Sequence, residues 1–150
     1  ANSANQALDR IINFFPEEKR QQVLMDLSLN IKGLISQRLI PRQTGVGRIA
    51  AMEVMLQSPL ISDLIFKGEV TRIKELMAKS TRIGMQTFDQ DLFQLYENGK
   101  ISYEEAIRNA DSKNELRLRI KLESKRDKPT AVDDSGGLQV MEEQEKARRY

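Results

Sequence analysis

Residues 84–102 read GMQTFDQDLFQLYENGKIS and contain the clearest helix start in the chain. Thr87 and Gln90 have the spacing of a capping box, in which the threonine hydroxyl accepts from a free backbone N–H and the glutamine side chain reaches back to Thr87. Asp89 lies where the positive end of the helix dipole favours an acid. The stretch therefore predicts a short packed helix that ends at Gly99 and needs no catalytic role. Its expected buried face consists of Phe88, Leu92, Leu95 and Tyr96.

The neighbouring segments carry helix signals of the same kind. The pairs Ser102/Glu105 and Ser112/Glu115 repeat the capping-box spacing ahead of further apolar residues. Upstream, Ser58–Pro59 combines an N-cap serine with a proline at the first helical position. We therefore expect short helices joined by short turns throughout the second half of the folded chain.

The first half predicts two helices followed by a β-hairpin. A cap at Ser3 begins the first helix, and Pro16 separates it from the second. The segments GLISQRLIPR and GRIAAMEVMLQ are then short apolar runs joined by the turn-forming PRQTGVG, which predicts strands at 34–40 and 48–56. Glycines 45 and 47 also raise the question of a phosphate loop, but a hairpin turn is favoured because no Lys-Ser/Thr and no helix follow them.

Composition excludes several classes of function. The 150 residues include no cysteine and no histidine, which excludes disulfides, Cys/His zinc sites, thiol nucleophiles and Ser/His/Asp triads. No metal site is predicted, and no segment is long and apolar enough to predict a membrane span. The net charge of +2 arises from interspersed acids and bases, so no nucleic-acid partner is expected. The charged, large-apolar-poor segment at 123–150 predicts a disordered tail.

Several segments in this order resemble the hexameric secretion ATPases that drive type IV pilus retraction, the PilT/PilU family. The resemblance extends from Ala1 to about Leu122. The family's retraction motif falls on residues 60–67, where both arginine positions of the motif are lost, so the chain is more similar to the accessory PilU branch. The similar segments are ANSANQALDRIINFFP, LSLNIKGLISQRLIPR, GRIAAMEVML, SPLISDLIFKGE and GMQTFDQDL.

This resemblance implies an α/β fold: residues 1–57 as the C-terminal part of a RecA-like P-loop ATPase core with helices and a β-hairpin, and 58–122 as a small all-α domain. It also implies a cytoplasmic motor that uses ATP and Mg²⁺ to power pilus retraction and twitching motility. No G-x-x-x-x-G-K-[ST] motif occurs here, so catalytic residues are expected upstream of Ala1 and the chain alone is expected to be inactive. The absence of an initial Met favours a start upstream as well.

Partners are also implied by the resemblance. They are further copies of the protein in a homo-hexamer, inner-membrane components of the pilus machine and a paralogous retraction ATPase. The motor would then be peripheral to the inner membrane. Without the resemblance, a self-contained α+β domain whose helices cover the hairpin is the favoured fold. For function, a non-enzymatic helical adaptor is the second hypothesis and a DNA-binding helical regulator is the third. A Walker-type loop upstream of Ala1 distinguishes the motor from the adaptor.

Candidate site residues follow from the same comparison, each with a plainer alternative. Asn2 and Ser3 would lie near the nucleotide, or would only begin a helix. Two basic residues near a strand end, Arg38 and Arg42, would face a neighbouring subunit's nucleotide, although a solvated strand end is favoured. Glu53 is either a buried acid that contacts a partner or a conformational relay or, as favoured by strand alternation, an outward-facing residue. The motor-coupling candidates are Ser62, Asp63, Phe66 and Lys67, with Phe66 alternatively packed beneath the next helix.

Overall fold

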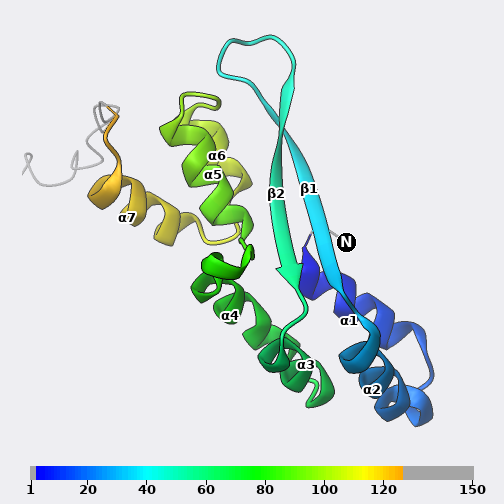
Figure 1. Ribbon diagram of the computed structural model, residues 1–150. Coiled ribbons are helices and arrows are strands. Elements are labelled where there is room, and N and C mark those ends of the chain that lie inside the picture. Colours follow the sequence, from blue (N-terminus) through cyan, green and yellow to red (C-terminus); the bar gives the residue numbers. More distant parts are fainter. Residues whose placement is uncertain (1–2, 127–150) are drawn as a thin grey trace, which may run out of the picture.

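A computed structural model describes residues 3–126. A long antiparallel hairpin forms its centre, and seven α-helices surround it on one side and at one end (Figure 1). The fold confirms the expected combination of helices with one hairpin. The strands are β1 (Gly33–Pro41) and β2 (Arg48–Leu56), and the helices are α1 (Ala4–Phe14), α2 (Arg20–Asn30), α3 (Pro59–Phe66), α4 (Ile73–Lys79), α5 (Phe88–Glu97), α6 (Tyr103–Asn109) and α7 (Lys113–Glu123). Short 3₁₀ turns at Glu17–Lys19, Val70–Arg72 and Thr81–Ile83 precede α2, α4 and α5.

The hairpin turn confirms the predicted strands and their connection. Pairing runs in register from Gly33 opposite Leu56 to Pro41 opposite Arg48. Gly45 and Gly47 have φ values of 77° and 75°, a left-handed conformation that glycine adopts without a steric penalty. These glycines therefore serve the turn, as favoured over the phosphate-loop interpretation.

The two faces of the hairpin have opposite environments. On the inner face, Ala51 and Met55 of β2 are fully buried beneath the helices. On the outer face, Ile35 and Leu39 of β1 remain 69% and 55% exposed. Within residues 3–126 no strand pairs with the outer edge of β1. The described chain thus covers one face of its sheet and leaves an apolar face and one edge open.

The inner face of the hairpin contributes to two hydrophobic clusters. Met55 belongs to the first cluster, while Ala51 and Ile40 belong to the second. The predicted domain division after residue 57 stays a prediction, although the first cluster contains residues from both sides of that division. The first cluster consists of Ala4, Leu8, Ile12, Leu24, Met55, Ile61, Ile65, Val70, Ile73, Met77 and Met85. The second consists of Ile40, Ala51, Phe88, Leu92, Phe93, Tyr96, Ile101, Ala106, Ile107, Leu116 and Ile120.

Most predicted helix starts are confirmed. The Gln90 N–H donates to Thr87 Oγ1 at 3.3 Å and the Thr87 N–H donates to Gln90 Oε1 at 3.0 Å, which completes the capping box. The side chains of Ser3, Ser58 and Ser102 each cap their helix as expected.

The capping box predicted at Ser112 is wrong. Its side chain makes no cap bond. Instead, Asp89 of α5 accepts from the backbone N–H groups of Asp111 and Ser112 at 2.7 and 2.8 Å. A carboxylate from 23 residues earlier in the chain therefore accepts from the Ser112 N–H, the bond that the capping box assigned to the side chain of Glu115.

Residues 84–102 also attach α5 to the edge of β2. Gln86 exchanges two backbone hydrogen bonds with Val54, at 2.9 and 3.0 Å. Asp91 accepts from the Met52 N–H at 2.7 Å, and the Gln86 side chain donates to the Met52 carbonyl at 2.9 Å. Two residues of this stretch, Gln86 and Asp91, thus replace a third strand along the outer edge of β2.

The end of α7 leads into residues that still contact α5. Glu97 accepts from the Ser124 hydroxyl and from the Lys125 N–H, both at 2.7 Å. The Arg126 guanidinium lies 4.6 Å from the centre of the Tyr96 ring. The first residues of the predicted tail are therefore packed, whereas the remainder of that prediction, residues 127–150, lies outside the described residues.

Candidate functional site

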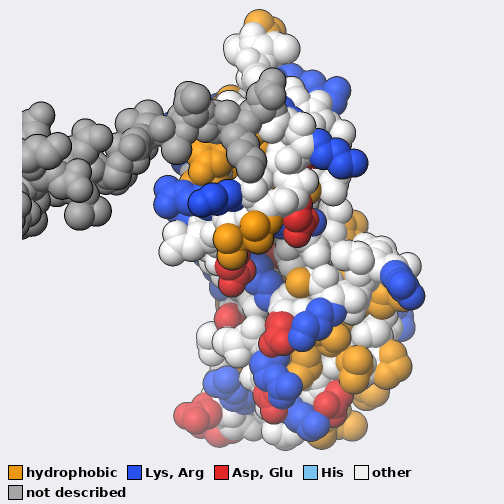
Figure 2. Space-filling view, turned by 90° about the vertical axis from the view of Figure 1, so that its left-hand side faces the viewer, with side chains coloured by type: hydrophobic (Ala, Val, Ile, Leu, Met, Phe, Trp, Pro, Cys, Tyr) orange, Lys and Arg blue, Asp and Glu red, His pale blue; other side chains and the backbone are white. Residues whose placement is uncertain are grey.

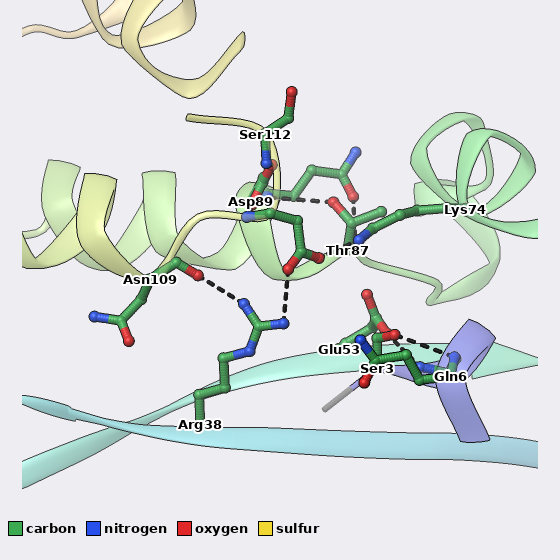
Figure 3. A network of polar contacts seen from close by, with 12 residues as sticks. Ser3, Gln6, Arg38, Glu53, Lys74, Thr87, Asp89, Asn109 and Ser112 are labelled. Carbon is green, nitrogen blue, oxygen red and sulfur yellow. Dashed lines mark hydrogen bonds and ion pairs between the residues drawn. The ribbon is translucent and has the colours of Figure 1, made fainter. Parts of the chain in front are cut away.

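Glu53 lies on the buried inner face of β2, so the expectation that it faces outward is wrong. Its side chain is 1% exposed, and its Oε1 accepts from the Ala4 N–H at 2.7 Å. Strand alternation correctly separated Glu53 from Met52 and Val54, but it did not reveal that the helices cover the face of Glu53. Figure 3 shows Glu53 beside Ser3, at the start of α1, and near Thr87, at the start of α5.

Opposing influences act on the Glu53 carboxyl group. Burial raises its pKa above the ordinary value, and this effect is the largest. The Ala4 N–H, the charge of Lys74 and the backbone of Phe88 oppose the rise, while the charge of Asp111 adds to it. Glu53 Oε2 is fully buried and accepts no hydrogen bond. The group is thus held firmly at one oxygen and left unsatisfied at the other.

Arg38 does not lie at a solvated strand end, so the favoured interpretation of this residue is also wrong. Its guanidinium donates to the Asn109 carbonyl at 2.6 Å and to Asp111 Oδ1 at 2.7 Å (Figure 3). The guanidinium carbon also lies 3.9 Å from the centre of the Phe88 ring. Because β1 presents Arg38 on the covered face, the side chain is directed at α5 and at the loop after α6.

Asp111 connects this arginine to α4. Its second oxygen, Oδ2, accepts from Lys74. Burial alone would raise the pKa of Asp111, but the bonds to Lys74 and Arg38 outweigh burial and lower the pKa. One carboxylate therefore joins β1, α4 and the loop between α6 and α7.

Sequence reasoning missed Lys74, Asp89 and Asp111 as members of this network. Arg38 and Asp111 are 73 residues apart in the chain, and Lys74 and Asp111 are 37 apart. Neither helix periodicity nor capping spacing reports contacts over such separations, so no local signal identified them.

The nucleotide-proximal candidates are not brought together. Ser3 is 7% exposed and its hydroxyl accepts from the Gln6 N–H at 3.3 Å, while Asn2 lies outside the described residues. Arg42 is exposed beside the hairpin turn, far from the start of α1 along the hairpin in Figure 1, and donates to the Arg48 carbonyl at 3.2 Å. Within residues 3–126, Ser3, Arg38 and Arg42 therefore do not lie together in one site. Nor do three or more Asp and Glu side chains within residues 3–126 converge as a metal site would require.

The motor-coupling candidates lie on α3 and beside an open groove between α3 and α4. Asp63 and Lys67 line this groove and pair with each other at 2.8 Å, and both are about half exposed. Phe66 is 46% exposed and Ser62 is half-buried. Phe66 is therefore not fully packed beneath the next helix.

The surface around this groove carries charges of both signs. Figure 2 shows Lys and Arg side chains intermingled with Asp and Glu and with hydrophobic side chains over the lower half of this face. None of the helices in the described part is long and apolar enough to cross a bilayer.

Comparison with known proteins gives strong matches to pilus ATPases. The chain is 51% identical over its whole length to the type IV pilus ATPase PilU of Pseudomonas aeruginosa, of which it spans 40%. It is 37% identical to the type IV pilus retraction ATPase PilT of the same organism, over 72% of this chain and 31% of PilT. A crystal structure of the pilus retraction motor PilT with bound ADP superposes with a TM-score of 0.69 at 33% identity, covering 79% of this chain and 32% of that one. No family model matches the chain.

Proposed function

Because the chain is homologous to the C-terminal part of PilU and PilT, pilus retraction ATPases of twitching motility, we propose that it forms the C-terminal part of a PilU-like motor ATPase. In this proposal the whole protein hydrolyses ATP and uses the energy to power type IV pilus retraction. The observation that carries it is the 51% identity to PilU over the complete chain.

Two observations favour a PilU-like over a PilT-like protein. Identity to PilU exceeds identity to PilT, at 51% against 37%, and the PilU match covers all of this chain. The segment from Leu60 to Lys67 also lacks both arginines of the retraction motif. We therefore infer an accessory role beside a paralogous retraction ATPase.

The open side of the hairpin supports a larger parent fold. An isolated two-stranded hairpin is marginally stable, and an unpaired edge with an exposed apolar face is typical of a sheet that continues. In the proposal, residues 1–57 complete a RecA-like core whose other strands come from upstream, and 58–122 form a helical domain.

Nucleotide chemistry belongs mainly to residues upstream. ATP with Mg²⁺ would be held there, and no catalytic residue is assigned to this chain. Of the nucleotide-proximal candidates, Arg42 is exposed and able to reach a neighbouring subunit, whereas Arg38 is already engaged within its own chain. Asn2 and Ser3 remain candidates through their position just before α1. The motor would act as a cytoplasmic homo-hexamer attached to inner-membrane components of the pilus machine.

The exposed side chains of α3 are the proposed contact that couples the motor to a partner. Phe66 exposes almost half of its surface beside the charged pair of Asp63 and Lys67, and Ser62 lies on the same helix. Truncating Phe66 to alanine in the full-length protein should reduce twitching while ATP hydrolysis persists. Leu118→Ala, which truncates another exposed apolar side chain on α7, is the matched control and should twitch normally.

ATP hydrolysis distinguishes the motor from the adaptor. We expect the purified full-length protein to hydrolyse ATP in the presence of Mg²⁺, and residues 1–150 alone to show no turnover. A full-length protein that neither binds nor hydrolyses ATP would contradict the motor and favour a non-enzymatic adaptor.

A further inference from the structure

Helix α1 begins at the carboxyl group of Glu53: Ala4, the first residue of α1, donates its N–H to Oε1 at 2.7 Å. The residues on either side of Glu53 hold the start of α5, because Val54 exchanges two backbone hydrogen bonds with Gln86 and the Met52 N–H donates to Asp91. The N-terminal turn of a helix carries unpaired N–H groups and a partial positive charge. The carboxyl group therefore ties the start of α1 to the part of β2 that holds the start of α5.

Glu53 also lies at the boundary between the two hydrophobic clusters. Its neighbours on the inner face of β2 are Ala51, which belongs to the second cluster, and Met55, which belongs to the first. Helix α1 packs in the first cluster and α5 in the second. The carboxyl group is thus a polar contact between two apolar units that are otherwise packed separately.

Packing alone does not account for an acid at this place. A buried polar atom without a hydrogen bond is unfavourable, and Glu53 Oε2 is such an atom. An apolar side chain of similar length would fit between Ala51 and Met55 and would join the two clusters. The role of the acid must therefore lie in what its other oxygen holds.

We propose that Glu53 is a positioning residue that fixes the start of α1 against the start of α5, so that displacement of the segment just before α1 is passed to helices α5–α7. This inference rests on the proposed function, in which that segment lies near the nucleotide. The network beside Glu53 extends the connection, because Lys74 and Asp111 link α4 to the loop before α7 and Arg38 links both to β1.

The test compares Glu53→Met and Glu53→Gln in the full-length protein with wild type. Methionine keeps the length of the side chain and removes the acceptor, whereas glutamine keeps an acceptor for the Ala4 N–H. Glu75→Gln is the matched control, because this glutamate is an exposed residue of α4 whose ion pair, with Lys79, lies within its own helix. Amide hydrogen exchange, the thermal midpoint and steady-state ATP hydrolysis are measured for each variant.

We expect Glu53→Met to speed exchange in the first turns of both α1 and α5 without lowering the thermal midpoint. We expect its kcat to fall about 2- to 30-fold, the range seen when residues that couple distant sites are changed, with KM little altered. Glu53→Gln should recover most of the activity, and Glu75→Gln should match wild type in every measurement.

The opposite results separate the two proposals. Unchanged exchange at α1 and α5 in Glu53→Met, or altered exchange with wild-type kcat, would overturn the positioning role. If Glu53→Met does not fold, a Glu53→Gln protein that is folded but no more active than background would overturn it too, because its acceptor is retained. A wild-type protein without ATP hydrolysis would overturn the proposed function instead, while the exchange data would still report whether Glu53 holds the two helices.

Discussion

The ion pair between Arg38 and Asp111 should be one of the strongest polar contributions to the stability of this chain. Replacing Arg38 with methionine keeps an unbranched side chain and removes the guanidinium, which lies over the Phe88 ring. Two charge-assisted hydrogen bonds, at 2.6 and 2.7 Å, are lost with it, and Asp111 keeps only Lys74 as its basic partner.

The loss of unfolding free energy in this variant depends on how exposed Arg38 and Asp111 are to solvent. Hydrogen bonds to charged groups contribute about 1.5–3 kcal/mol each, and a cation–π contact adds about 0.5–1 kcal/mol. Both side chains are 21% exposed, so screening reduces these values. We expect Arg38→Met to lower the free energy of unfolding by about 2–3 kcal/mol, and the coupling to Asp111→Asn in a double-mutant cycle to be about 1–2 kcal/mol.

Urea unfolding of the four proteins of this cycle, at low and at high salt, measures both quantities. Arg119→Met is the matched control, because Arg119 also stacks on a ring, Phe93, and pairs with an acid, Glu123, but only within its own helix. That variant should lose less than about 1 kcal/mol. A coupling near zero, or equal losses for Arg38→Met and Arg119→Met, would refute the argument that long-range burial gives the Arg38 pair its strength.

Three further predictions concern the core and the helix starts. Burial raises the pKa of Glu53 above its ordinary value of 4.5, so the folded state binds its proton more tightly than the unfolded state. The stability of wild type relative to Glu53→Gln should therefore be greatest below pH 4.5 and fall as the pH rises through the raised pKa of the folded state, which unfolding at a series of pH values measures; a constant difference would contradict this. Thr87→Ala removes the hydroxyl of the capping box and should lower the free energy of unfolding by about 1 kcal/mol in urea, with Thr81→Ala as an exposed control. Leu92→Ala empties a fully buried position of the second cluster and should cost about 2–5 kcal/mol, against less than about 1 kcal/mol for the exposed Leu122→Ala in the same assay.

Local signals predicted the helix starts and ends because the groups that form each helix cap lie within four residues of one another. The box of Thr87 and Gln90 and the cap of Ser58 depend only on neighbours along the chain. Resemblance in short segments predicted the relationship to pilus motors, since whole motifs are kept in order. Both kinds of inference used information that is contiguous in the sequence.

The site could not be predicted because both faces of the hairpin carry apolar residues. Ile35 and Leu39 alternate with Ser36 and Arg38 on β1, so alternation suggests that the polar face is the exposed one. The structure has the reverse arrangement. The polar face is covered because the helices supply it with buried partners, and the sequence does not show that Asp111 and the start of α1 meet there.

The two edges of the hairpin differ in how many of their backbone groups are already hydrogen-bonded, which determines where a further strand can pair. Gln86 and Asp91 occupy the backbone groups of Val54 and Met52, so a further strand finds that part of β2 already bonded. The outer edge of β1 has no strand partner within residues 3–126, and the apolar outer face lies beside it. The whole edge of β1 is therefore the place that we expect a further strand of a larger protein to occupy. Movement of such a strand would reach Arg38 through β1 directly, and from there Asp111 and the loop before α7, without passing through the start of α1.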